Sequence, residues 1–127
     1  MGLEALSEAK TIFEGTKMLL PSLIDFRRQL HTNPELGFDL PKTKKALTER
    51  LSAQGIAWQE FAGSIVATLG EGDGKPLLLR SEMDALPMQE ESGLPFASQI
   101  HKHAHCCGHD LNAAILLGTL LLLKKEK

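Results

Sequence analysis

The 127-residue sequence lacks the marks of several protein classes. It has no basic cluster: 14 lysine and arginine residues stand against 16 aspartate and glutamate residues, a formal net charge of −2. Nucleic acids and anionic membranes are bound through concentrated positive charge, so we expect neither as a partner. The longest apolar run, residues 113–123, is about half as long as the roughly 20 residues that a membrane-spanning helix needs.

Cysteine is scarce, because Cys106 and Cys107 are the only two and are adjacent. The Cα atoms of neighbouring residues lie ~3.8 Å apart, below the usual ~4.4 Å minimum for a disulfide, so we expect no disulfide within the chain. The first residues, which include Glu4 and Glu8, lack the basic stretch and apolar run of an export signal. Together these features predict an intracellular, cytoplasmic protein with reduced thiols.

Two common catalytic motifs are also missing. The glycine-rich run at residues 70–74 has neither the Lys-Ser/Thr ending nor the GxGxxG spacing of a phosphate-binding loop, so we interpret it as a turn. No serine lies in a GxSxG motif, and a Ser-His-Asp triad therefore has no support. A cysteine and a histidine two residues apart on extended backbone are poorly placed for proton transfer within the pair.

With 43% hydrophobic and 24% charged residues, the composition is that of one globular domain. Its helical patterns predict four helices, over residues 3–13, 19–31, 41–54 and 109–125. The second is the clearest, because its apolar residues recur at helical spacing: Leu19, Leu23, Phe26 and Leu30. Pro41 suits the first turn of the third helix, and Gly55 suits the position just after its end.

Three short segments predict strands. Residues 56–61 and 64–69 flank Ala62-Gly63 and predict a hairpin. Residues 76–80 show no alternation, which is typical of a strand covered on both faces. A long irregular connection follows from residue 85 to 105. These elements predict an α/β fold in which a mixed sheet of three strands is flanked by helices.

The unusual feature of the sequence is a dense group of residues that bind metals, formed by His101, His103, His105, Cys106, Cys107, His109 and Asp110. Thiolate and imidazole are the ligands of zinc and similar divalent ions. Cys107 and His109 are two residues apart, and on extended backbone such side chains point the same way. His101, His103 and His105 alternate, as an exposed polar loop also does, so the residue types alone leave a metal site and a polar loop both open.

Glu82 and Asp84 form a second alternating pair, at the end of the predicted strand 76–80. In open α/β sheets, ligands bind near the carboxyl ends of strands. The spacing permits three interpretations: a general acid/base pair, carboxylates that orient ligating imidazoles, or solvated turn residues.

Three segments resemble the opening motifs of the metal-dependent amidohydrolases and metallopeptidases that include hippurate hydrolase and the auxin-conjugate hydrolases. They are His31-Thr-Asn-Pro-Glu-Leu-Gly-Phe38, Arg80-Ser-Glu-Met-Asp-Ala-Leu-Pro-Met-Gln-Glu-Glu-Ser-Gly-Leu-Pro-Phe96 and His105-Cys-Cys-Gly-His-Asp110. The likeness covers about residues 20–123, in the family's order. It implies that residues 1–127 are the N-terminal part of a catalytic domain with the binuclear-metal, peptidase-like fold, without the lid domain.

The resemblance further implies that Cys107 and His109 are metal ligands, and that Asp84, Glu82 and Asp110 are carboxylates supporting the site. The cofactor would be a divalent metal, manganese or zinc, with two ions in the complete enzyme. The implied reaction is hydrolysis of the amide bond of a small-molecule N-acyl amino acid. The family's general-base glutamate has no counterpart here, so no catalytic residue is assigned and residues 1–127 alone are expected to show negligible activity.

The chain departs from the family pattern at several positions. Glu82 stands where the family commonly has Asp, and Cys106 stands where it usually has Ala. Leu111-Asn112 stands where the family generally has Gly-His. One alternative is therefore a truncated or degenerate, non-catalytic homologue that acts as a metal-binding or interaction module. Another is a structural zinc site in which His103 or His105 joins Cys107 and His109. In either case an open sheet edge and an apolar last helix predict self-association, or coverage by a missing C-terminal region.

Overall fold

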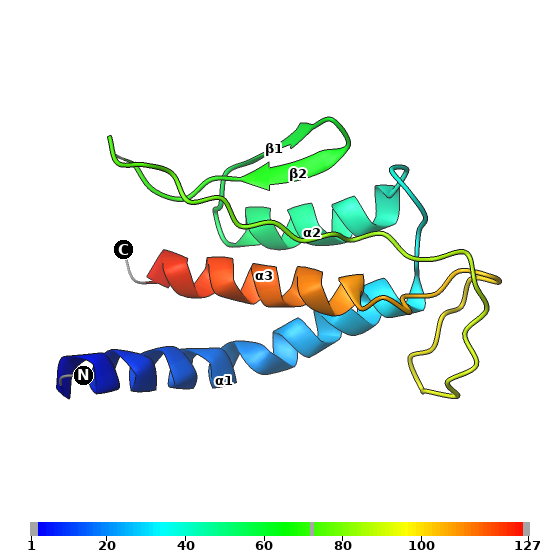
Figure 1. Cartoon of the computed structure of the whole chain (residues 1–127), viewed down its shortest axis with the longest axis horizontal. Coiled ribbons are helices and arrows are strands. Elements are labelled where there is room, and N and C mark those ends of the chain that lie inside the picture. Colours follow the sequence, from blue (N-terminus) through cyan, green and yellow to red (C-terminus); the bar gives the residue numbers. More distant parts are fainter. Residues whose placement is uncertain (1–2, 72, 126–127) are drawn as a thin grey trace.

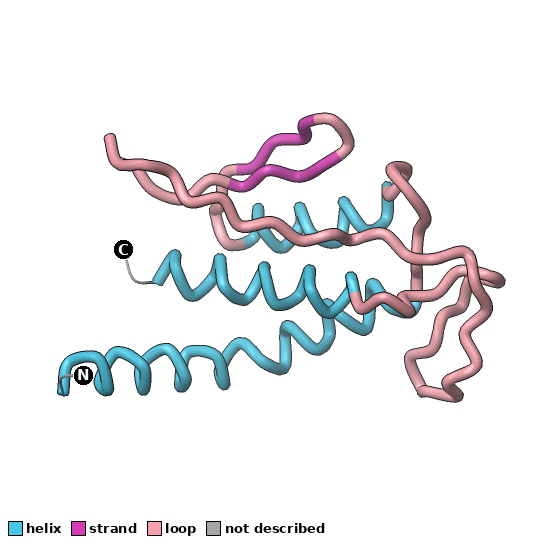
Figure 2. Tube along the Cα trace, in the orientation of Figure 1, coloured by secondary structure: helices cyan, strands magenta, loops and turns pink. Residues whose placement is uncertain are grey.

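The computed structural model describes residues 3–71 and 73–125. Its elements in chain order are helix α1 (Leu3–Thr32), helix α2 (Pro41–Ala53), strands β1 (Trp58–Phe61) and β2 (Ser64–Ala67), and helix α3 (His109–Lys125). In Figure 1, α3 lies between α1 and α2, and the hairpin lies beyond α2. Figure 2 shows that the chain between β2 and α3 forms neither helix nor strand, and its last part folds into a loop beside the start of α3.

Residues 3–13 and 19–31 were predicted as two helices, which is wrong, because α1 is continuous through both. Pro21 lies inside it and cannot donate a helical hydrogen bond, and the axis of α1 bends part-way along its length (Figure 1). α3 packs against α1, and Gly15, which lies between the two predicted helices, faces Leu122 of α3. Residues 7–14 are exposed, so tertiary packing accounts for the continuous junction and not for the first turns.

Two glycines allow α1 and α3 to approach closely. A Cβ atom at Gly118 of α3 would lie 2.7 Å from Cδ1 of Leu23, and one at Gly15 of α1 would lie 2.9 Å from Cδ2 of Leu122. A glycine inside a helix costs about 1 kcal/mol relative to alanine. Here the missing side chains leave room for a leucine of the opposite helix, so the cost is offset by packing.

The predictions for the third helix and the hairpin are confirmed. α2 begins at Pro41, and Gly55 after its end has a φ of +62°. The carboxylate of Glu35 caps α2 by accepting hydrogen bonds from the N–H groups of Lys42 (3.0 Å) and Thr43 (2.7 Å). β1 and β2 pair in antiparallel register through a turn at Ala62 and Gly63, both with positive φ, as tight hairpins require.

The predicted third strand at residues 76–80 is wrong. The α/β class stands, but the sheet consists of β1 and β2 alone over the described residues, and it is antiparallel rather than mixed. A strand exists only beside another strand, and residues 76–80 have no such neighbour in the part of the chain that the structure describes. Leu77 and Leu78 are consequently more than four-fifths exposed.

The core lies where α1, α2 and α3 meet. Its buried residues are Phe26, Leu30, Ala46, Leu51, Ile56, Ala113, Ala114 and Leu117. Phe26 and Leu30 belong to the stripe predicted from the sequence, and both are at most 2% exposed. No helix among residues 3–71 and 73–125 is long and apolar enough to cross a membrane. The glycine-rich run includes Gly72, which lies outside the described residues, and the chain bends at residues 73–74.

Candidate metal centre

The three sequence motifs meet at one end of the helices. Leu36 of the first motif forms a parallel β-bridge with Ala85 of the second, and the Ala85 N–H donates to the Glu35 carbonyl at 2.7 Å. Leu86 in turn forms an antiparallel bridge with Ala104, just before the third motif. These backbone contacts bring Asp84 next to the first residue of α3, although 25 residues separate the two.

That first residue is His109, whose ring is held on one side by Asp84. Nδ1 of His109 lies 2.9 Å from the carboxylate Oδ1 of Asp84 and 3.0 Å from its carbonyl oxygen. Both partners accept hydrogen bonds, so Nδ1 is the protonated nitrogen in this arrangement. A neutral ring then carries its lone pair on Nε2, which is the form in which histidine binds a metal ion.

Cys107 supplies an accessible sulfur close by in the chain. Both Cys106 and Cys107 are free thiols and are exposed, as expected for adjacent cysteines without a disulfide. Gly108, between Cys107 and His109, has a φ of +81°, a conformation that side chains other than glycine rarely adopt. The chain therefore turns sharply between the sulfur and the imidazole, immediately before α3 begins.

Behind this segment lies a group of four charged residues, which we name the charged cluster: Arg27, His31, Glu90 and Asp110. Arg27 Nε and His31 Nδ1 both donate to Oδ2 of Asp110, each at 2.7 Å. The other ring nitrogen of His31 donates to Oε1 of Glu90 at 3.0 Å. Asp110 is fully buried, so this carboxylate depends on its two cationic partners rather than on water.

Glu90 is held by further hydrogen bonds from its own loop. The Ser98 N–H donates to Oε2 of Glu90 at 2.6 Å, and the Ser92 hydroxyl donates to Oε1. Burial alone would raise the pKa of Glu90, but the hydrogen bonds from Ser92, Ser98 and His31 outweigh it and lower the pKa from 4.5 to about 2. Glu90 is therefore ionised at neutral pH and can balance a positive charge on His31.

His105 lies on the inner side of the same loop. It is 5% exposed, its ring stacks on that of His31 at 6.2 Å between centroids, and neither of its nitrogens has a hydrogen-bond partner among the described residues. Burial lowers the pKa of His105, which favours the neutral ring. His103 is placed differently, because its Nδ1 donates to the carbonyl of His101 at 2.9 Å.

The alternative of a structural zinc site gains no support from the described residues. Residues 3–71 and 73–125 contain no group of three His, Cys, Asp or Glu residues arranged to hold a metal ion. His105 and Cys107 lie in different surroundings, because His105 is buried whereas Cys107 is exposed. Cys107 and His109 thus form at most part of a metal site by themselves.

The two other carboxylates predicted to support the site contact different partners. Asp110 contacts Arg27 and His31, and no hydrogen bond joins it to His109 in the part of the chain that the structure describes. Glu82 lies near the surface, where Oε1 is 2.6 Å from Nη1 of Arg80. The pKa of Glu82 is lowered first by its own backbone N–H and then by Arg80, with a smaller effect of His109.

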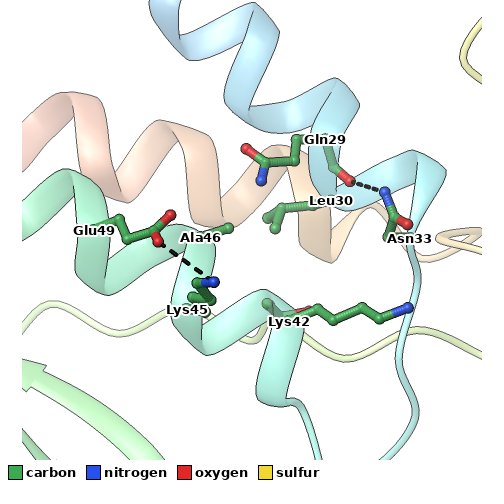
Figure 3. Close-up of a pocket in the computed structure, with 8 residues that line it drawn as sticks. Gln29, Leu30, Asn33, Lys42, Lys45, Ala46 and Glu49 are labelled. Carbon is green, nitrogen blue, oxygen red and sulfur yellow. Dashed lines mark hydrogen bonds and ion pairs between the residues drawn. The ribbon is translucent and has the colours of Figure 1, made fainter.

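A shallow groove elsewhere on the molecule shows no comparable chemistry. It lies between the end of α1 and α2, and Figure 3 shows its lining, including Gln29, Asn33, Lys42, Lys45 and Glu49. It has no thiol or imidazole, and Lys45 and Glu49 pair with each other at 3.8 Å. We therefore place the candidate site at Asp84, Cys107 and His109.

Comparison with known proteins finds relatives among metal-dependent peptidases and deacetylases. The model of the peptidase family M20/M25/M40 matches residues 78–127, which include Asp84, Cys107 and His109. The chain is related to these peptidases. The N-acetylcysteine deacetylase of Bacillus subtilis (strain 168) is 38% identical over 109 residues, which are 83% of this chain and 29% of that protein. The N-acetyldiaminopimelate deacetylase of Halalkalibacterium halodurans is 42% identical over 79% of this chain and 28% of its own length.

The fold agrees with the same family. The crystal structure of the Bacillus subtilis YXEP protein, described as a dinuclear metal binding peptidase from the M20 family, superposes with a TM-score of 0.81 at 36% identity. The match covers 87% of this chain and 32% of that protein. The predicted resemblance to metal-dependent hydrolases is thus confirmed, over about three tenths of the relatives' length.

The donors at the candidate site are chemically suited to a divalent metal ion. An exposed thiol and an imidazole whose Nδ1 is held by a carboxylate are ordinary ligands of zinc and related metals. Sequence reasoning assigned no role to Arg27, His31 or Glu90, although His31 opens the first motif, and it considered His105 only as a possible metal ligand. The position of His31 in the first motif was the one sequence signal that it matters for the site. Local periodicity could not predict its contact with Asp110, because 79 residues separate the two.

Proposed function

We propose that this chain is part of a metal-dependent hydrolase in which Cys107 and His109 bind a divalent metal ion. The observation that carries the proposal is the contact between Nδ1 of His109 and the carboxylate of Asp84, at 2.9 Å. A carboxylate that fixes the proton on one ring nitrogen directs the lone pair of the other outward, and this arrangement is characteristic of metal-binding histidines. The exposed thiol of Cys107, two residues earlier, is the second donor.

The residues of this chain would hold the ion and fix the geometry around it. A divalent ion there would supply a Lewis acid that polarises the carbonyl of an amide. Asp84 keeps Nδ1 of His109 protonated and orients the ring. Gly108 provides the turn that separates the two donors. The remaining ligands and the general base would come from residues outside this chain, because no third donor joins Cys107 and His109 within its described part.

The reaction we propose is cleavage of the amide bond of N-acyl amino acids, with manganese or zinc as the metal and two ions in the complete site. Two relatives are named as deacetylases of N-acetylated amino acids, and a structural neighbour is described as dinuclear. The chain spans less than a third of each of these proteins, so this activity belongs to a longer assembly of residues. We also propose a cytoplasmic location, where both thiols would remain reduced.

Metal binding by the purified chain tests the first part. Co²⁺ titration should give an absorption band from a cysteine thiolate bound to cobalt, and Cys107→Ser and His109→Gln should each abolish or strongly weaken it. Cys106→Ser is the matched control, since Cys106 is equally exposed and is expected to leave the band unchanged. Mild chelation should remove the ion, because two protein donors are fewer than the four of a closed structural zinc site. Binding that survives Cys107→Ser and His109→Gln would refute the proposal.

Activity measurements test the second part. Residues 1–127 alone should hydrolyse N-acetyl or N-benzoyl amino acids negligibly, whereas a longer chain that supplies the missing ligands and base should hydrolyse them in a metal-dependent way. Steady hydrolysis by residues 1–127 that Cys107→Ala abolishes would overturn the first expectation. Metal binding without any hydrolysis in the longer chain would instead favour a non-catalytic, metal-binding homologue.

A further inference from the structure

The charged cluster joins α1 to the segment that carries the candidate ligands. Arg27 and His31 are one turn apart on α1, and both donate to the same oxygen of Asp110 at 2.7 Å. Asp110 follows His109 directly in the first turn of α3. A side chain buried and held by two charged hydrogen bonds has little freedom, so the backbone at Asp110 is fixed relative to α1.

The charges in the cluster alternate along a chain of four groups. Both nitrogens of His31 face carboxylate oxygens, Asp110 Oδ2 on one side and Glu90 Oε1 on the other, and ionised carboxylates only accept hydrogen bonds. The ring of His31 therefore bridges the two carboxylates, and Arg27 donates to one of them. Oδ1 of Asp110 has no hydrogen-bond partner among the described residues, so the two bonds to Oδ2 carry the link. A buried network of this kind holds its geometry more tightly than a single surface ion pair.

The last turn of α1 and the residues after it fix His109 from two directions. Through His31 and Arg27 they hold Asp110, the residue after His109. Through the carbonyl of Glu35 they hold the N–H of Ala85, the residue after Asp84, and Asp84 binds the ring of His109. The backbone of His109 and the carboxylate that orients its ring are therefore both tied to the same end of α1.

We propose that Arg27 and His31 are positioning residues for the metal-binding segment 107–109, and that they raise its affinity for a divalent ion by fixing Asp110. This inference rests on the proposed function, because it requires that Cys107 and His109 bind the metal. Neither Arg27 nor His31 touches the ion in this scheme. They act by keeping the first turn of α3 in the orientation that presents both donors together.

A purely structural role for the two residues predicts a different result. It would lower the population of folded chains and leave the affinity of each folded chain unchanged. A positioning role lowers the affinity of the folded chain itself and alters the geometry around the ion. The dissociation constant for Co²⁺ and the position of the thiolate-to-cobalt absorption band, both measured where circular dichroism shows the chain to be folded, separate the two roles.

The test compares variants in the full 127-residue chain. Arg27→Met and His31→Gln should weaken Co²⁺ binding by about 10- to 100-fold, the usual effect of removing a group that supports a metal ligand, and should shift the absorption band. Arg27→Lys keeps the charge and should restore part of the affinity. It also guards against loss of folding, because the Arg27 side chain is 28% exposed and tolerates replacement better than a sealed residue. Phe26→Leu, a neighbouring core substitution on α1, is the control that lowers stability without changing the affinity.

Two results would overturn the inference, and they are distinguishable. If Arg27→Met and His31→Gln fold and bind Co²⁺ with the wild-type affinity and spectrum while Cys107→Ser loses the band, the positioning role is wrong and the proposed metal ligands stand. If Cys107→Ser and His109→Gln bind Co²⁺ like the wild type, the proposed function fails and the inference fails with it.

Discussion

The charged cluster and residues 77–79, which we name the leucine segment, reverse the usual distribution of polar and apolar groups. In the charged cluster, Asp110 is fully buried and His31 is 5% exposed. In the leucine segment, Leu77 and Leu78 are 82% and 83% exposed. A carboxylate is thus inside the protein while two leucines are outside it.

Partners explain the difference better than hydrophobicity does. The charged groups are buried because each finds an oppositely charged group within hydrogen-bond distance, from α1, α3 or the loop at residues 85–105. The leucine segment has no neighbouring strand among the described residues, and Leu77 and Leu78 stay largely exposed. Burial therefore follows from what the fold places nearby, and the two regions should respond oppositely to substitution.

The largest effect is expected for Asp110→Ala. Arg27 Nη2 lies only 3.3 Å from Nδ1 of His31, so loss of the carboxylate leaves the guanidinium and the imidazole ring side by side without the anion that both contact. Removal of one partner from a buried ionic group typically costs about 3–5 kcal/mol, and we expect about 4 kcal/mol in the free energy of unfolding, measured by urea denaturation. Glu14→Ala, which breaks an exposed pair with Lys17, should cost less than about 0.5 kcal/mol. Equal losses in both variants would contradict the comparison.

A second prediction compares two apolar residues on α3. Leu117 is 3% exposed and belongs to the core, whereas Ile115 is 58% exposed on the same helix. Leu117→Ala removes buried methyl groups and leaves a cavity, so the free energy of unfolding should fall by about 3 kcal/mol. Ile115→Ala should change it by no more than about 0.5 kcal/mol. A similar loss in both variants, seen by thermal or urea unfolding, would mean that α3 is packed differently.

The same contrast shows how far the sequence could go. The hairpin, α2 and α3 follow from local signals: Ala62-Gly63 for the turn, Pro41 and Gly55 for the ends of α2, and the apolar run for α3. The two errors in the fold arise from long-range packing. α1 continues through the junction at Gly15, which faces Leu122 of α3. Residues 76–80 form no strand, because no strand lies beside them in the described part of the chain.

For the site, individual residues could be predicted from the sequence, but their contacts could not. Cys107, His109 and Asp84 were indicated by residue type and by resemblance, and the structure brings Asp84 to His109. The contacts of Asp110 were not foreseen, because its partners Arg27 and His31 lie 83 and 79 residues away and carry no spacing signal. Charged side chains are normally expected at the surface, so only the fold reveals that Asp110 and His31 are buried.

A third prediction concerns the pH dependence of stability that Glu90 of the charged cluster causes. The pKa of Glu90 is lowered to about 2 in the folded chain, from 4.5. The unfolded chain therefore binds this proton first as the pH falls, so the stability that Glu90 contributes is present above pH 4.5 and is lost between pH 4.5 and about 2. The slope of the unfolding free energy against pH reports how many more protons the unfolded chain binds than the folded chain. Glu90→Gln should reduce that number by up to about one in this pH window. An unchanged slope would show that Glu90 is not held as described.

The smallest effect on stability is expected in the leucine segment. Leu78→Ser removes an apolar side chain that is 83% exposed, so the free energy of unfolding of the monomer should change by no more than about 0.5 kcal/mol. The same substitution should nevertheless change the behaviour of the chain in solution, because exposed leucines on unpaired backbone favour association with a second copy. Sedimentation over a dilution series should show self-association of the wild type and less of it in the variant. If the wild-type chain stays monomeric at every concentration, the leucine segment remains exposed to solvent, and exposure alone does not make it an interface.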